Sequence, residues 1–302
     1  MTSSQQGALL RAMPAVFVLI WSTGFIVARY GMPHAPPITF LSIRYALSLL
    51  CFGVWIALAR AEWPKTQAQW LHLCVSGVLM HAGYLGGVWT AVKAGMGAGT
   101  VALLVGLQPV LTAVWLSQVQ RSEAASTSRR QWLGLLLGLA GLVLVVWRKL
   151  GAGELSAWNL SLAALALLSI TAGTLYQKRY VKPCDVRTAN TVQLFAALVV
   201  SLPLAMLESE PVVLHPHFLG AMVWSVIGLT LGGSSLLYLL IQRGAATQVT
   251  SLLYLVPPST ALMAWLLFKE PLTPVMLLGM ALTALGVSMV VRSEGKPQPA
   301  AA

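Results

Sequence analysis

Residues 103–109 read LLVGLQP, and positions 252–258, which lie 149 residues further along the chain, read LLYLVPP. The same offset aligns glycines across the two halves of the sequence: Gly24 with Gly173, Gly83 with Gly232, and Gly95 with Gly244. Near the end of each half the offset becomes 145, which aligns two further pairs: Gly134 with Gly279, and Gly141 with Gly286. Glycine and proline in one register mark backbone geometry that both halves require. The sequence therefore predicts a duplication, with a first copy over 1–150, a second over 151–292 and a short disordered cytoplasmic tail at 293–302.

Apolar residues dominate the composition. Of the 302 residues 57% are hydrophobic and 9% are charged, and the mean hydropathy is +0.78. A soluble domain of this composition would have too little polar surface to cover itself. We therefore expect a protein that lies in a membrane.

Ten apolar segments approach the ~20 residues that a helix needs to cross a bilayer. They are 12–30, 37–60, 68–93, 97–120, 130–148, 157–177, 187–207, 217–241, 246–268 and 272–292. Five fall in each half, and an odd number of spans turns the second copy over relative to the first. The predicted fold class is an all-α membrane protein with ten transmembrane helices in two inverted five-helix repeats.

Positive charges predict the orientation. With the N-terminus in the cytoplasm, five basic residues fall in the outer loops: Arg29, Lys93, Arg148, Lys149 and Lys269. Arg44 lies within a span, and the other thirteen of the 19 Lys and Arg residues fall on the cytoplasmic side. This asymmetry follows the positive-inside rule, so both termini are expected in the cytoplasm. The net charge of +11 then reflects topology and contact with the lipid bilayer, and no nucleic-acid partner is expected.

Ionisable residues at membrane depth are few. All eight acidic residues lie in loops or at helix ends, whereas intramembrane carboxylates are the usual carriers of coupled protons or sodium ions. Two candidates remain, Arg44 and His81. Arg44 either satisfies neighbouring carbonyls, as a snorkelling arginine does, or binds a substrate carboxylate or closes the outer gate. His81 is either a packing residue or a proton-linked group.

Glycines and prolines carry the packing information. Gly134 and Gly138 have the spacing that allows close helix approach, either within the chain or between two copies through the fifth or tenth span. Three prolines fall near the middle of the fourth and ninth spans: Pro109, Pro257 and Pro258. A proline in mid-helix frees a carbonyl and bends the helix. Because both copies keep it, we expect a paired bend at the centre of the pore.

Rings and polar side chains gather at comparable depths in the two halves. The candidate lining residues of a substrate cavity are Trp21, Thr23, Arg44, His81, Tyr84, Trp89, Gln108, Thr171, Tyr176, Tyr238 and Tyr254. Such a pocket suits an amphipathic solute, although each ring is equally compatible with bundle packing or an interfacial belt. No cofactor is expected. No metal site is expected either, because His215-Pro216-His217 has HxH form without a third ligand.

Several short motifs, taken in order, resemble the EamA family of the drug/metabolite transporter (DMT) superfamily. They are Trp21-Ser22-Thr23-Gly24-Phe25, Arg44-Tyr45, Leu107-Gln108-Pro109, Val256-Pro257-Pro258 and Lys269-Glu270-Pro271-Leu272-Thr273. The resemblance covers nearly the whole chain, and the overall layout is similar to that of YddG-type amino-acid exporters. It implies a bacterial inner-membrane protein in which helices one to four and six to nine surround a central cavity.

The resemblance also implies a function. We expect export of aromatic and other neutral amino acids and related metabolites by alternating access, as facilitated diffusion or with weak proton coupling, by a monomer rather than a homodimer. Ile170 and Gln108 stand where YddG-type sequences carry aromatic residues, which argues against a strictly aromatic substrate. One alternative is export of lipophilic cations, which lacks the buried glutamate that small multidrug relatives use. A remote alternative is an intramembrane enzyme, which would need clustered catalytic residues at membrane depth.

Overall fold

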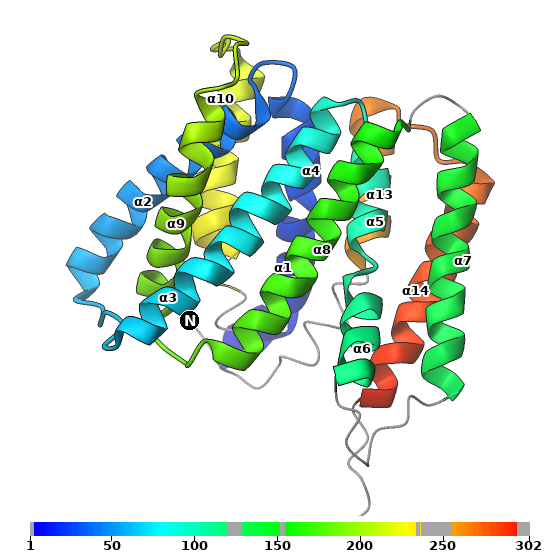
Figure 1. Cartoon of the computed structure of the whole chain (residues 1–302), viewed down its shortest axis with the longest axis horizontal. Helices are drawn as coiled ribbons and strands as arrows, with labels where there is room; N and C mark the ends of the chain where they lie inside the picture. Colours follow the sequence, from blue (N-terminus) through cyan, green and yellow to red (C-terminus); the bar gives the residue numbers. More distant parts are fainter. Residues whose placement is uncertain (1–2, 120–128, 152–154, 234–235, 237–254, 295–302) are drawn as a thin grey trace, which may run out of the picture.

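The computed structural model describes residues 3–119, 129–151, 155–233, 236 and 255–294. The described chain is helical, with these elements: α1 (Ser3–Gly31), α2 (Pro37–Ala59), α3 (Gln67–Gly77), η1 (Val78–Gly83), α4 (Tyr84–Lys93), α5 (Ala98–Val105), α6 (Gln108–Val119), α7 (Arg129–Gly151), α8 (Ala157–Tyr180), α9 (Val186–Ala205), α10 (Pro216–Val223), η2 (Trp224–Gly233), α13 (Val256–Phe268) and α14 (Pro274–Glu294). Three spans combine several elements: α3, η1 and α4 form the third, α5 and α6 the fourth, and α10 and η2 the described part of the eighth. The predicted ten-helix, all-α fold is confirmed (Figure 1).

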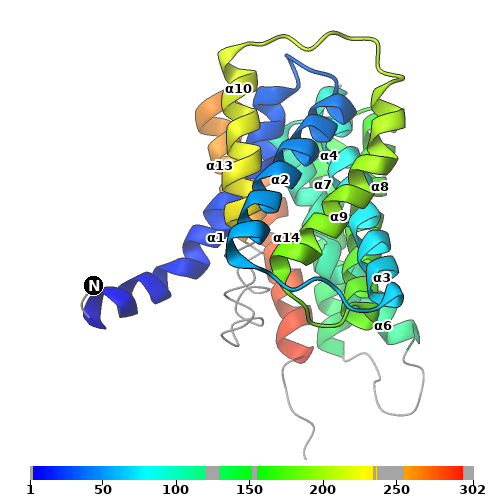
Figure 2. The same cartoon turned by 90° about the vertical axis from the view of Figure 1, so that its left-hand side faces the viewer.

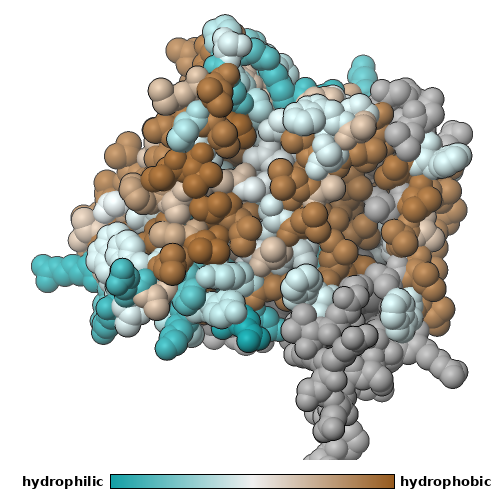
Figure 3. All heavy atoms as spheres, viewed as in Figure 1, coloured by the Kyte–Doolittle hydropathy of each residue, from teal (hydrophilic) through white to brown (hydrophobic). Residues whose placement is uncertain are grey.

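The helices have the length and the surface of a membrane bundle. Five of them are long and apolar enough to cross a bilayer: Pro37–Ala59, Gln67–Lys93, Ala157–Tyr180, Val186–Ala205 and Pro216–Gly233. The other five spans contain shorter apolar helices: Ala15–Gly31, Ala98–Thr112, Trp132–Trp147, Val256–Phe268 and Pro274–Gly286. Large apolar side chains face outward from these helices, and Figure 3 shows them across the middle of the molecule with hydrophilic residues toward its two ends. Such a belt is stable in lipid rather than in water.

Most predicted boundaries agree with the helices, but two spans differ. The first helix begins at Ser3 rather than at residue 12, and its first turns project away from the bundle (Figure 2). The fourth span is broken between Val105 and Gln108 rather than continuous. The stretch 237–254, which contains the end of the eighth predicted span and the start of the ninth, lies outside the described residues.

The two copies are inverted and pack against each other in matched pairs. In Figure 1, α1 rises from the lower to the upper end of the bundle, while α8, which opens the second copy, descends. Equivalent spans of the two copies are in contact: α2 packs on α9, α7 packs on α14, and α5 of the fourth span packs on α13 of the ninth. In addition α1 packs on η2 and α13, just as α8 packs on η1, α4, α5 and α6. An inverted repeat with a pseudo-two-fold axis produces this pattern.

The glycines of the fifth and tenth spans face each other inside the chain. A Cβ atom added at Gly141 would meet the carbonyl oxygen of Gly279, and one added at Gly286 would meet the backbone of Gly134 and Gly138. The repeat aligns Gly134 with Gly279 and Gly141 with Gly286, so the two contacts are exchanged by the pseudo-symmetry. The glycine face of α7 is therefore packed against α14, which confirms the intrachain interpretation.

The upper end of the bundle carries the loops at 32–36, 94–97, 206–215 and 269–273. Here carboxylates of the second copy bind the first copy. Glu208 accepts hydrogen bonds from the first turn of α2, with the Thr39 nitrogen at 2.7 Å, and Glu270 accepts from two backbone amides at the start of α5, at 3.0 and 3.4 Å. Lys93 Nζ lies 2.5 Å from Glu210. Carboxylates are favourable at helix N-termini, so these contacts hold the two copies together at this end.

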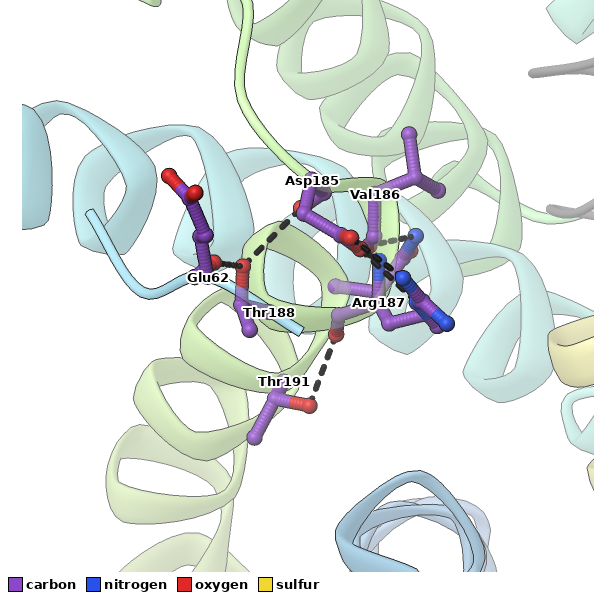
Figure 4. A network of polar contacts seen from close by, with 7 residues as sticks. Glu62, Asp185, Val186, Arg187, Thr188 and Thr191 are labelled. Atoms are coloured by element: carbon purple, nitrogen blue, oxygen red, sulfur yellow. Dashed lines mark hydrogen bonds and ion pairs between the residues drawn. The ribbon is translucent and has the colours of Figure 1, made fainter. Parts of the chain in front are cut away.

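The lower end carries the loops at 60–66 and 181–185, which Figure 4 shows from close by. Thr188 Oγ1 donates to the carbonyl oxygen of Glu62 at 2.8 Å and to that of Asp185 at 3.0 Å. The Asp185 side chain caps α9 by accepting from the Arg187 backbone nitrogen at 2.9 Å, and it pairs with the Arg187 guanidinium. The hydrogen bonds from Arg187 lower the pKa of Asp185. Most of these contacts are local to the start of α9.

Candidate functional site

Two adjoining pockets lie between the copies in the middle of the bundle. The first has a cavity volume of about 100 Å³ and lies between α1, α2, η1, α4, α8 and η2. The second, of about 80 Å³, lies between α1, α4, α5, α6, α8 and α13. Both are lined by Trp21, Phe25, Tyr84 and Ile170, and together the two pockets make up the cavity. Among the described residues, none of α7 or α14 lines either pocket, and these two helices pack on each other.

The cavity brings together a majority of the described candidate residues. Trp21, Arg44, His81, Tyr84 and Trp89 line the first pocket. A second group lines the other pocket: Trp21, Tyr84, Gln108, Pro109 and Pro257. Pro257 comes from the second copy, and the others are spread over the first four spans of the first copy. The helices of the bundle place them around one space.

Three candidates are not among the lining residues of either pocket: Thr23, Thr171 and Tyr176. The hydroxyl groups of Thr23 and Thr171 donate to carbonyl oxygens of their own helices, at 2.5 Å and 2.7 Å, as threonines within helices commonly do. Tyr176 lies toward the lower end, where its hydroxyl oxygen is 2.8 Å from His72 Nδ1. The remaining candidates fall outside the described residues: Tyr238 and Tyr254.

Arg44 is the charged group of the cavity. Its side chain is buried, with 7% of the residue exposed, and it donates from Nε and Nη2 to the Thr230 hydroxyl oxygen at 3.2 and 3.0 Å. Thr230 in turn donates to the carbonyl oxygen of Ser225 at 2.8 Å. No carboxylate among the described residues pairs with Arg44. A positive charge without a counter-ion is costly in a low-dielectric interior, so this site favours an anion.

His81 lies in the same pocket and is held by its surroundings. The hydroxyl group of Tyr45 donates to the His81 carbonyl oxygen at 2.9 Å, and the two rings meet edge to face. The His81 side chain lies close to that of Gln193, whose Nε2 donates to Ser76 Oγ at 3.0 Å. His81 therefore has packing partners as well as access to the cavity.

Both copies contain π-helical turns at aligned positions, a feature that the sequence analysis missed. The turn η1 spans 78–83, and the offset of 149 places it at 227–232, within η2. These turns carry His81 and Thr230, and π-helical turns often occur at functional sites because they displace side chains from the regular helical register. Their one signal in the sequence is the alignment of Gly83 with Gly232.

The paired prolines begin helices. In the fourth span α5 ends at Val105, and α6 begins at Gln108, directly before Pro109. In the ninth span α13 begins at Val256, with Pro257 and Pro258 in its first turn. A proline in the first turn loses no helical hydrogen bond. The predicted bend of the fourth span is thus a break, and Pro109 and Pro257 line the cavity beside it.

Comparisons with known proteins agree with this architecture. The chain is 24% identical over 289 residues to the uncharacterized inner membrane transporter YedA of Escherichia coli K12, which covers 93% of this chain and 91% of the relative. It is 26% identical over 295 residues to the uncharacterized transporter YvbV of Bacillus subtilis 168, covering 95% and 93%. It is also 22% identical over 280 residues to a probable amino-acid metabolite efflux pump of Salmonella typhimurium LT2, covering 89% and 90%.

The fold and the family are shown by two further matches. A crystal structure of a protein with 18% sequence identity superposes with a TM-score of 0.65 and covers 92% of this chain and 95% of that one. Residues 12–147 and 157–292 each match the EamA-like transporter family, which contains transporters and not enzymes. The chain therefore belongs to the EamA-like transporter family of the DMT superfamily and is a multi-pass membrane transporter of small molecules.

Proposed function

We propose that this protein exports neutral amino acids and related metabolites across the bacterial inner membrane. Support comes from the relative named as a probable amino-acid metabolite efflux pump and from the chemistry of the cavity. The distribution of Lys and Arg supports cytoplasmic termini, which makes the upper end in Figure 1 the outer end. Substrate would then enter from the lower end and leave at the upper end.

The observation that carries the proposal is the uncompensated charge of Arg44. All amino acids carry a carboxylate, and a carboxylate that approached Arg44 would supply the missing counter-ion. An arginine can bind a carboxylate through two parallel hydrogen bonds. Because Arg44 already uses Nε and Nη2 for Thr230, the carboxylate would use the remaining donors or replace Thr230.

The walls of the cavity suit the rest of an amino acid. Trp21, Phe25, Tyr84 and Trp89 provide rings around the first pocket, and Ile170 provides an aliphatic wall. Apolar side chains, aliphatic or aromatic, would bury their surface here.

Lipophilic cations fit this cavity less well. A cationic substrate would meet the like charge of Arg44, and the acidic side chains that the structure describes lie at helix ends or in loops. A cation in a low-dielectric pocket needs a negative partner. The multidrug alternative therefore has less support than amino-acid export.

Alternating access supplies the mechanism that we propose. The break between α5 and α6, beside Pro109, is the position at which the fourth span would bend, and the first turn of α13 is its counterpart. The contacts of Glu208, Glu270 and Lys93 would hold the outer end closed in this conformation. Since no described carboxylate lies at membrane depth, we propose facilitated diffusion, with His81 as the group through which weak proton coupling would act.

The test is transport by purified protein in proteoliposomes. We expect counterflow of a labelled neutral amino acid that unlabelled amino acids inhibit and cationic dyes do not, with empty liposomes as the control. Competition by the dyes alone would favour the multidrug alternative, and no competition by any of the twenty amino acids would refute the proposal. Equal fluxes with and without a pH gradient would exclude proton coupling.

A further inference from the structure

Three histidines from the two copies meet at the upper end of the bundle. His34 lies in the loop between α1 and α2, His215 is the N-cap residue of α10, and His217 is in the first turn of that helix. One ring nitrogen from each lies within 4.8 Å of the others. The ring of His34 stacks on that of His215 with centroids 4.2 Å apart, and the His217 ring is 4.7 Å from that of His215.

The backbone around this histidine cluster, His34, His215 and His217, is held in place. The Val213 nitrogen donates to the His34 carbonyl oxygen at 2.8 Å, which joins the two loops. The ring of Tyr30 packs against that of His217 at 5.3 Å. Figures 1 and 2 show the loop before α10 and the loop after α1 at the same end of the molecule. The rings are therefore brought together by folding and do not meet through sequence proximity alone.

The chemistry of the cluster is that of a transition-metal site. Imidazole nitrogen is a preferred ligand of Zn²⁺, Ni²⁺ and Cu²⁺, and three histidines with a water molecule complete a tetrahedral shell. Bonds of about 2.0–2.1 Å require the nitrogens to come closer than they are here, which rotation of these side chains, none of them fully buried, allows. His215 Nδ1 accepts from the His217 nitrogen at 3.1 Å, so a metal bound at Nδ1 would replace that cap.

The third ligand, which the HxH motif of 215–217 lacks, therefore comes from the other copy: His34 in the loop between α1 and α2.

We propose that His34, His215 and His217 bind one divalent transition-metal ion, of the Zn²⁺ class, and that this ion links the first copy to the second at the upper end. His34 belongs to the first copy and the other two ligands to the second, so a bound ion fixes the distance between the copies. If the upper end must open for export, the metal holds it closed and inhibits transport. This second consequence rests on the proposed function, whereas metal binding does not.

Metal binding is tested on the full-length protein in detergent, without a polyhistidine tag. Titration calorimetry with Zn²⁺ should give one ion per chain, and His34→Ala and His217→Ala should each weaken binding by ten-fold or more. The matched control is His72→Ala at the lower end, which should bind as the wild type does. Equal melting temperatures without metal would show that the variants fold. Absence of Zn²⁺ binding, or binding that these variants leave unchanged, would overturn the site.

The consequence for transport is tested separately. Zn²⁺ added to the side of proteoliposomes that the upper end faces should reduce amino-acid flux several-fold, and a chelator should restore it. The His217→Ala protein should be insensitive. Flux that persists at a saturating Zn²⁺ concentration would refute the proposal that the bound ion holds the upper end closed. If no amino acid is transported at all, the proposed function fails, but the titration still decides whether the histidine cluster is a metal site.

Discussion

Arg44 in α2 donates two hydrogen bonds to the hydroxyl oxygen of Thr230 in η2, at 3.2 and 3.0 Å, and so joins the first copy to the second beside the cavity. The repeat aligns this pair with Gln193 and His81. Those two side chains also lie close to each other. The pseudo-symmetry thus brings together the same two positions twice but with different chemistry: one pair holds a fixed positive charge and the other holds a histidine. The two sides of the cavity are therefore chemically different, and we expect the carboxylate of a substrate to lie at Arg44.

Replacing the arginine should remove the preference for a carboxylate. Hydrogen bonds to charged groups contribute about 1.5–3 kcal/mol, so Arg44→Gln should raise the KM for an amino acid by about ten-fold or more. The measurement is competition of labelled amino-acid counterflow by an amino acid and by its amide. Wild-type protein should discriminate between them and Arg44→Gln should not.

The control for Arg44 is Arg187→Gln, because Arg187 lies at the lower end of the molecule and pairs with Asp185. This variant should keep the wild-type preference for the acid over the amide. If Arg44→Gln protein with a normal melting temperature still prefers the acid, then Arg44 is a packing residue and the assignment is wrong.

Ile170 should control the size of the substrate. It lines both pockets and is the repeat partner of Trp21, which also lines both. Ile170→Trp would add a ring to the space that the pockets share and make the copies alike. We expect competition by tryptophan and phenylalanine to fall several-fold in the counterflow assay while competition by small amino acids persists. An equal loss for small and large amino acids would indicate general disruption of the bundle.

Helix positions and the repeat could be predicted because they depend on apolar length and on the register of glycine and proline. The break beside Pro109 and the packing of Gly141 on Gly279 follow from those residues. Which side chains point toward the cavity could not be predicted in the same way. A membrane helix is apolar on all sides, so the sequence around Thr23 or Thr171 does not distinguish the cavity face from the other faces.

Contacts between distant loops were also beyond prediction. His34 and His215 are separated by most of the first copy and part of the second, and no pattern in the sequence joins them. The π-helical turns at His81 and Thr230 depend on how neighbouring helices pack rather than on local propensity. What the repeat did indicate was where the copies differ, at Arg44 against Gln193 and at His81 against Thr230. The structure brings Arg44 of one copy to Thr230 of the other, and His81 to Gln193.

The break in the fourth span should affect turnover more than binding. Pro109→Ala would allow α5 and α6 to form one continuous helix, because alanine supplies the missing amide and is the best helix former. We expect counterflow to be several-fold slower, while the concentration of unlabelled amino acid that inhibits it by half stays unchanged. If only that inhibitory concentration changed, Pro109 would act in substrate binding and not in the bend.

Asp185 should make stability depend on pH at the acidic end. Hydrogen bonds from Arg187 lower its pKa in the folded state, so its contribution is present above the unfolded-state pKa of about 3.9 and is lost as the pH falls through the folded-state pKa. Asp185→Asn keeps a capping side chain but removes the charge. Its melting temperature should therefore be lower than that of the wild type at pH 6, by an amount equivalent to at most about 1 kcal/mol. The two proteins should converge as the pH falls below 4, and a difference that is constant across this range would contradict the charge effect.

The glycine contact between α7 and α14 should be sensitive to a single methyl group. A Cβ at position 141 would meet the backbone of Gly279, so Gly141→Ala should separate the helices and cost about 1–3 kcal/mol. Gly53→Ala is the matched control, because a Cβ there has nothing within 4 Å. Thermal unfolding in detergent should show a lower melting temperature for Gly141→Ala than for the wild type and no such decrease for Gly53→Ala. If Gly141→Ala instead changed the oligomeric state at an unchanged melting temperature, this glycine face would join two copies of the chain and not the fifth and tenth spans of one.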